Sequence, residues 1–97
     1  MQNKRLIYIA GAVTGTTDYI ERFEDAAYQA VLLKYLPINP IELPHNHDKS
    51  WESYMKETII AMMRCEAIFM MKGWRQSKGA TIEHHLAKKL NYTIIYE

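Results

Sequence analysis

The sequence has one cysteine, no dense cluster of positive charge and no long apolar run, and each absence excludes a class of protein. Because Cys65 is alone, no intrachain disulfide can form, and we expect a buried thiol in a reducing compartment. The formal net charge is +1 and no basic run exceeds two residues, which argues against a polymeric nucleic acid as partner. No apolar run approaches the ~20 residues of a membrane span, so a cytoplasmic protein without a membrane partner is expected.

Motifs for cofactors and metals are also missing. The loop Gly11-x-x-x-Gly15 lacks the G-x-G-x-x-G of dinucleotide folds and the G-K-[ST] of a P-loop. His84 and His85 are adjacent, so they point about 100° apart on a helix and cannot bind one metal ion as an i,i+4 pair does. His45-Asn46-His47 shares only its letters with a nuclease motif. We therefore expect no cofactor and no metal ion.

The residues that are present are sufficient for one domain over residues 1–97, because 48% of them are apolar. Their periodicity predicts an alternation of strands and helices. The expected strands are 6–10, 36–39, 66–71 and 92–96, and the expected helices are 18–34, 50–64 and 77–90. Lys4 and Arg5 precede the first strand as in a signal peptide, but the apolar run is too short for one. Right-handed crossovers then give an α/β fold with a four-stranded parallel sheet, for which we expect the order 2-1-3-4.

The helix starts carry recognisable capping signals. Asp18 and Glu21 have the spacing of a capping box, and Ser50 is expected to cap the second helix. The buried stripe expected for the first helix is Ile20, Phe23, Ala27, Ala30 and Val31.

Three loops are expected to form a pocket. Ligands of parallel sheets bind beyond the carboxyl ends of the strands, near the point where the strand order reverses. The loops at those ends are 11–17, 39–49 and 72–78.

Glu83 is out of place in the last helix. At 100° per residue it falls in the middle of an apolar stripe formed by Ala80, Leu86, Ala87 and Leu90. Burying an unpaired carboxylate is costly, so such a group normally needs a partner, a proton or a role. Glu83 is therefore a candidate for chemistry, and the alternative is a glutamate that caps loop amides.

Two loops could hold an anion or a sugar hydroxyl. Ser77 and Gly79 open the helix that carries Glu83, and a helix start with free amides attracts anions. The alternative for Ser77 is an ordinary N-cap. In the first loop, the hydroxyl of Thr14 and the backbone around Gly11 and Gly15 offer a weaker signal of the same kind.

Four further residues have two interpretations each. Tyr8 lies in the first strand, where an aromatic ring belongs to the core, but its hydroxyl could reach the pocket. Glu66 begins the third strand, and its spacing alone favours a solvated position. Trp74 and Arg75 could stack on and pair with a nucleotide, or cover the edge of the sheet.

Four segments together form a recognisable pattern: Ile7-Tyr8-Ile9-Ala10-Gly11-x-x-Thr14-Gly15, Cys65-Glu66-Ala67-Ile68, Gly73-Trp74 and Ser77-x-Gly79-Ala80-x-x-Glu83-x-x-x-Ala87. With this pattern the chain resembles the nucleoside 2-deoxyribosyltransferase-like family, and is closest to a small uncharacterised subfamily from phages and bacteria related to deoxynucleoside monophosphate N-glycosidases. The resemblance spans essentially the whole chain, and the spaced Ser-Gly-Glu block is its most specific part.

This resemblance implies a small Rossmann-like (flavodoxin-like) three-layer fold, a homodimer, and cleavage of an N-glycosidic bond or deoxyribosyl transfer on a nucleoside or nucleotide. The family's catalytic glutamate corresponds to Glu83, which would attack the anomeric carbon. Relatives that act on free nucleosides have aspartate at the position of Ser77, and relatives that act on monophosphates have serine. A phosphorylated ligand is therefore expected, with Tyr8 orienting Glu83 or the sugar.

One departure from the family pattern supports a second hypothesis. The family usually has aspartate, which helps to position the sugar or the base, where this chain has Glu66. A carboxylate displaced by one methylene, ~1 Å, would impair catalysis if it positions the substrate. The alternative function is a nucleotide-binding module that sequesters or senses its ligand without turning it over.

Overall fold

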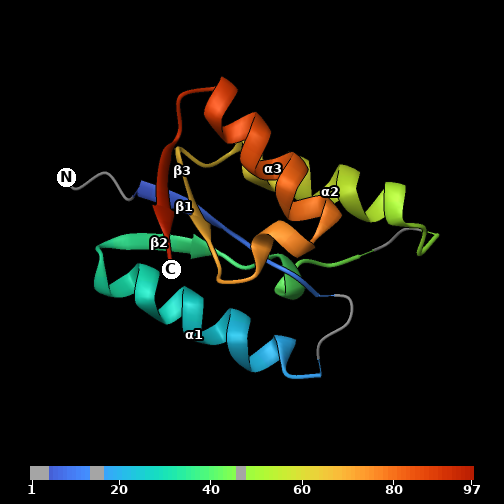
Figure 1. Cartoon of the computed structure of the whole chain (residues 1–97), viewed down its shortest axis with the longest axis horizontal. Coiled ribbons are helices and arrows are strands. Elements are labelled where there is room, and N and C mark those ends of the chain that lie inside the picture. Colours follow the sequence, from blue (N-terminus) through green and yellow to red (C-terminus); the bar gives the residue numbers. More distant parts are fainter. Residues whose placement is uncertain (1–4, 14–16, 46–47) are drawn as a thin grey trace.

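The computed structural model describes residues 5–13, 17–45 and 48–97. Their elements follow one another as four strands alternating with three α-helices, as expected (Figure 1). The strands are β1 (Arg5–Ala10), β2 (Tyr35–Ile38), β3 (Ala67–Met70) and β4 (Thr93–Tyr96). The helices are α1 (Tyr19–Leu32), α2 (Trp51–Met63) and α3 (Lys78–Lys89), with short 3-10 turns η1 (Pro40–Glu42) and η2 (Trp74–Gln76).

The strands form one parallel sheet in the order β2-β1-β3-β4, which confirms the expected α/β class and strand order. In this order β1 has β2 on one side and β3 on the other, so the chain reverses its direction of travel across the sheet at the β1/β3 pair. Tyr8 pairs with Ile68 and Ala10 with Met70 in that register. A ligand pocket is expected above the carboxyl ends of these two strands.

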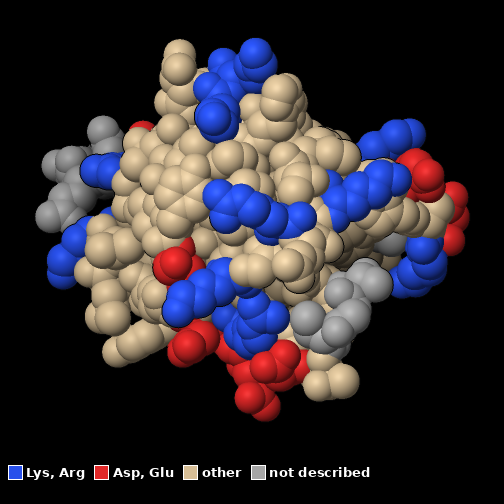
Figure 2. All heavy atoms as spheres, in the orientation of Figure 1, with Lys and Arg blue, Asp and Glu red and all other residues tan. Residues whose placement is uncertain are grey.

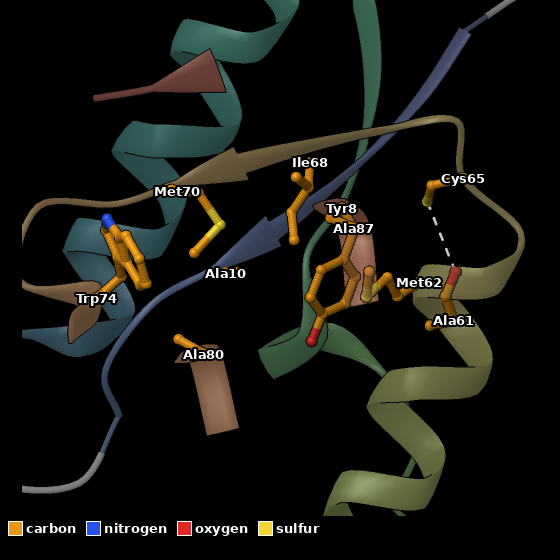
Figure 3. Close-up of a cluster of buried hydrophobic side chains, with 10 residues drawn as sticks. All are labelled: Tyr8, Ala10, Ala61, Met62, Cys65, Ile68, Met70, Trp74, Ala80 and Ala87. Carbon is orange, nitrogen blue, oxygen red and sulfur yellow. Dashed lines mark hydrogen bonds between the residues drawn. The ribbon is translucent and has the colours of Figure 1, made fainter. Parts of the chain in front are cut away.

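Each face of the sheet has its own apolar core, because the central strands present apolar side chains in both directions. On one face Ile7, Ile9 and Phe69 pack against α1 through Phe23 and Ala26. On the other face α2 and α3 cover the sheet, and α1 lies alone on its side (Figure 1). Figure 3 shows this second core, formed by Tyr8, Ala10, Ala61, Met62, Cys65, Ile68, Met70, Trp74, Ala80 and Ala87. The result is a three-layer Rossmann-like arrangement.

The first helix differs from expectation at its start and on its buried face. The side chain of Asp18 makes no cap hydrogen bond, so the predicted capping box does not form. The buried positions are Phe23, Ala26 and Ala30, whereas Ile20 is 52% and Val31 49% exposed. Phe23 and Ala30 are buried as predicted, but the helix presents Ala26 to the sheet, and this orientation leaves Ile20 and Val31 outside the buried face.

Helices α2 and α3 begin as expected. The Ser50 hydroxyl accepts a hydrogen bond from the Ser53 amide, and the Ser77 hydroxyl accepts one from the Ala80 amide, at 3.1 Å in both cases. Within the described ranges, no helix is long and apolar enough to cross a membrane.

The central strand β3 carries the most sensitive packing. We expect Phe69→Ala, at a side chain that is 1% exposed, to lower the free energy of unfolding by about 3–5 kcal/mol, because it leaves a cavity under α1. The matched control is Ile60→Ala on α2, where the side chain is 56% exposed and the change should be below about 1 kcal/mol. Urea unfolding followed by circular dichroism measures both, and equal effects would contradict this assignment of the core.

Candidate functional site

A pocket of about 720 Å³ lies beyond the carboxyl ends of β1 and β3, where the strand order predicts one. All three loops expected around it contribute, with Gly11–Val13, then Pro40, His45 and Lys49, then Gln76–Lys78. Phe23 reaches the pocket from α1, although it belongs to the core on the other face of the sheet. The remaining lining residues are Tyr8, Ile9, Ser50, Trp51, Tyr54, Met55, Gly79, Ala80 and Glu83.

The carboxyl group of Glu83 lines the pocket and is bound to Tyr8. Glu83 is 4% exposed, on the buried face of α3 beside Ala80 and Ala87, as its place in the apolar stripe predicted. The Tyr8 hydroxyl donates a hydrogen bond of 2.8 Å to Oε2 of Glu83, and Tyr8 is itself 1% exposed. Residues 75 positions apart in the sequence thus meet at the base of the pocket.

The protonation of this pair follows from its burial. Burial raises the pKa of Glu83 from its ordinary 4.5 to about 7, and the hydrogen bond from Tyr8 opposes part of that rise. Burial raises the pKa of Tyr8 well above 10.0, and the Glu83 carboxylate raises it further. Tyr8 therefore remains protonated at neutral pH and can donate a hydrogen bond, while the carboxyl group of Glu83 titrates near neutral pH.

Ser77 and the two glycines of the site have local roles that the structure makes visible. Ser77 caps α3 and lines the pocket, so the two interpretations of this residue are compatible. A Cβ on Gly79 would lie 2.8 Å from the sulfur of Met55, so glycine lets α3 begin close to α2. A Cβ on Gly11 would lie 2.6 Å from the sulfur of Met71, so glycine leaves room for the Met71 side chain beside the first loop. Thr14 and Gly15 lie outside the described residues.

Glu66 is exposed and does not reach the pocket. Its backbone pairs with Leu6 and Thr93, just before β3, which places it at the amino end of the sheet. Parallel strands share their carboxyl ends, so a residue that precedes a strand lies at the opposite end from the site. The family role of a positioning carboxylate therefore does not transfer to Glu66 within one protomer, and its spacing had already favoured a solvated position.

Trp74 and Arg75 line a second hollow of about 410 Å³ and not the pocket of Glu83. Trp74 is 8% exposed, and its ring packs on His84 with 4.2 Å between centroids. The Arg75 guanidinium lies 4.6 Å from the centre of the indole. His84 also meets the hydroxyl of Tyr96 at 2.7 Å. These contacts cover the end of β4 and hold Trp74 against α3, as the structural alternative expects.

The wall formed by α2 was not predicted. Trp51, Tyr54 and Met55 all line the pocket, because i, i+3 and i+4 positions share one face of a helix. His45 joins them: its Nδ1 lies 2.8 Å from Oε2 of Glu57, its Nε2 lies 3.0 Å from the Pro40 carbonyl, and its ring stacks on Tyr54. One feature of the sequence could have predicted this wall. Its residues lie within or immediately after a loop that follows the carboxyl end of a strand.

Residues 5–96 match a family described as "Domain of unknown function (DUF4406)". The chain belongs to this family. A comparison with curated proteins finds no match. The description of the DUF4406 family assigns no activity, so a function can be inferred only from the chemistry of the pocket.

Within its described lining, the pocket of this DUF4406 domain carries more basic than acidic side chains. Lys49 and Lys78 line the pocket, and Glu83 is the one acidic residue among its described lining. Over the face drawn in Figure 2, lysines and arginines form separate groups with acidic side chains between them, which is unlike a continuous nucleic-acid track. Among the residues that the structure describes, no cluster of histidine, cysteine, aspartate and glutamate could hold a metal ion.

The raised pKa of Glu83 makes the stability of the fold depend on pH. A carboxyl group whose pKa is higher in the folded state binds a proton more tightly there, so the stability it contributes is lost as pH rises from about 4.5 to about 7. Glu83→Gln removes this loss. We expect the variant to exceed the natural protein in unfolding free energy by up to ~3 kcal/mol at about pH 8, and to differ little at about pH 4.

Urea unfolding across this pH range measures the effect, and Glu24→Gln, at an exposed carboxylate of α1, is the matched control. A constant difference between Glu83→Gln and the natural protein at all pH values would contradict the raised pKa.

Proposed function

We propose that the protein cleaves the N-glycosidic bond of a nucleoside monophosphate, with Glu83 as the nucleophile and water or a second base as the acceptor. The observation that carries this proposal is the buried carboxyl group of Glu83 in the pocket, hydrogen-bonded to Tyr8. A carboxylate held in an apolar pocket is poorly solvated, which favours attack on an electron-poor carbon. The resemblance to deoxyribosyltransferase-like proteins gives the same role to Glu83.

The reaction consists of two displacements at the anomeric carbon. An Oε atom of Glu83 bonds to that carbon as the bond to the base nitrogen breaks, and the electron pair goes to the base, which takes a proton from solvent. Water then attacks the same carbon, the ester bond to Glu83 breaks, and the water's second proton is released. A second base in place of water gives transfer. The products of hydrolysis are a free base and a sugar phosphate.

Tyr8 would serve as the positioning group of this mechanism. Its hydroxyl donates to Oε2 of Glu83, which leaves the other carboxyl oxygen for the anomeric carbon. The same hydrogen bond lowers the pKa of Glu83 against the effect of burial. It therefore keeps a larger share of Glu83 ionised at neutral pH, and ionised Glu83 is the reactive form.

A phosphate would lie at the start of α3. The Ser77 oxygen accepts from the Ala80 amide and still has its own hydrogen to donate. The helix start adds backbone N–H groups and a positive dipole, and Lys78 and Lys49 add charge at the same pocket. A pocket of about 720 Å³ is within the range that holds small-molecule ligands.

A second candidate function is a nucleotide-binding module that uses the same pocket without turnover. The position of Glu66 favours it, because the pocket of one protomer then holds a single carboxyl group. Glycosidases of the two-carboxylate type use a second acid to assist the leaving group.

We also propose a cytoplasmic homodimer. Several apolar side chains of α1, β2 and the turn between them are at least 42% exposed in the isolated chain, which supports burial against a second copy. They are Ile20, Tyr28, Val31, Leu32, Leu33 and Leu36, with exposures between 42% and 62%.

The first experiment is incubation with deoxynucleoside 5′-monophosphates, followed by chromatography for free base. We expect base release by the natural protein and a loss of at least ~10³-fold with Glu83→Ala, because the nucleophile is removed. Glu66→Ala should retain full activity, and it is the matched control for loss of a carboxylate. Tight binding without base release would reject the enzyme and support the binding module.

The second experiment is the pH profile of base release. Activity should rise with pH through about 7, because the ionised form of Glu83 attacks. Tyr8→Phe removes a hydrogen bond that lowers the pKa of Glu83, so the midpoint of the profile should move to higher pH. Tyr54→Phe, which also lies in the pocket wall, should leave the midpoint nearly in place. An unchanged midpoint in Tyr8→Phe would contradict the positioning role.

A further inference from the structure

One wall of the pocket is aromatic. Trp51 begins α2, Tyr54 follows one turn later, and the ring of His45 stacks on Tyr54 with 4.9 Å between centroids and 30° between planes. All three side chains line the pocket. The reaction proposed above uses Tyr8 and Glu83 and assigns no role to these three side chains.

Trp51 is the outermost member of this wall. Its side chain is 39% exposed, whereas Trp74 is 8% exposed in the core. A flat ligand that covers a partly exposed indole at the edge of a pocket removes its surface from water, which favours binding. Indole also stacks strongly with nucleobases.

A cation lies over the indole of Trp51. Nζ of Lys78 is 4.0 Å from the centre of the Trp51 ring. Trp51 and Lys78 are the first residues of α2 and α3, so this contact joins the starts of two helices at the pocket. A cation–π contact at a solvated site is weak enough to be exchanged for another partner.

The pair contains two binding groups that satisfy one another: a flat π surface and a mobile positive charge. A ligand with a flat ring and an anionic group can replace both halves of that contact at once. Its ring takes the place of the ammonium on the indole, and its anion takes the ammonium. Nucleoside monophosphates have both groups, whereas a free nucleoside or a sugar phosphate has one.

We propose that Trp51 is the platform on which the base of the ligand stacks, and that the base displaces Lys78 from the indole so that Lys78 pairs with the phosphate. This inference rests on the proposed function in taking a nucleoside monophosphate as the ligand, but it requires no bond cleavage. Trp51 is a specificity-determining residue in this account, and Glu83 remains the catalytic one.

The sequence allows a direct optical test, because it has two tryptophans and one of them, Trp74, lies outside the pocket. The probes are the four common deoxynucleoside 5′-monophosphates, with 2-deoxyribose 5-phosphate as the ligand without a base. The titrations are made with the Glu83→Gln variant, because it lacks the nucleophile and does not turn the ligand over during the measurement. We expect a saturable loss of tryptophan emission with at least one monophosphate and no loss with the sugar phosphate.

Trp51→Phe and Trp74→Phe are matched variants that separate the two sources of emission. Trp74→Phe should retain the quenching, and Trp51→Phe should lose it. Calorimetry should show binding about 3–10-fold weaker in Trp51→Phe and about 10–100-fold weaker in Trp51→Ala, since the stacking surface shrinks and then disappears. Thermal unfolding confirms that the variants are folded, which is expected because Trp51 is partly exposed.

Lys78→Met, which keeps the length of the side chain and removes its charge, tests the second half of the exchange. We expect it to retain quenching by the base but to lose about 10-fold or more of the preference for a monophosphate over the matching nucleoside. Lys49→Met, at the other lysine of the pocket, is the control for loss of charge alone. An equal effect in both variants would overturn the role assigned to Lys78.

The outcomes separate this inference from the proposed activity. Quenching through Trp51 without any base release from the natural protein supports the platform and rejects the enzyme. Base release with quenching that persists in Trp51→Phe, or with binding unchanged in Trp51→Ala, overturns the platform and leaves the enzyme intact. If calorimetry shows no saturable binding to any of the four monophosphates, the platform is overturned as well.

Discussion

The hydrogen bond from Tyr8 to Glu83 is the interaction on which the site depends. It joins the central strand β1 to helix α3 inside the core, between two side chains that are almost fully buried. A carboxyl group in that place is unfavourable for folding unless it keeps a proton or a donor. The protein supplies the donor from an inner strand of the sheet, so the orientation of Glu83 is fixed by the sheet and not by a loop.

Much of this arrangement could be predicted from the sequence because it follows from periodicity. The four apolar runs and three helical patterns are sufficient for the parallel order, and that order determines which loops meet. Glu83 was recognisable because a charged residue interrupted the apolar stripe between Ala80 and Ala87. The same reasoning assigned Glu66 to a solvated strand start. The likeness to a family motif suggested a catalytic role for Glu66, and that role does not survive the geometry of one protomer.

The features that could not be predicted depend on side-chain packing between elements distant in sequence. Trp74 could have faced either the ligand or the sheet edge, and its contact with His84 on α3 determines the outcome. The orientation of the first helix places Ala26, and not Ile20 or Val31, on the buried face. The aromatic wall on α2 could not be predicted without knowing how that helix packs against α3. The close contact between Gly79 and Met55 determines this packing.

Phe23 gives the pocket a connection to both halves of the domain. It belongs to the core beneath α1, while Glu83 and the α2 wall belong to the opposite layer. A ligand in the pocket would therefore touch both layers. Separate layers can open locally at different free energies, and a ligand that binds only the closed form of both raises the cost of opening either one. Occupancy of the pocket would thus change hydrogen-exchange protection in α1, on the far side of the sheet from Glu83, as well as at the site itself.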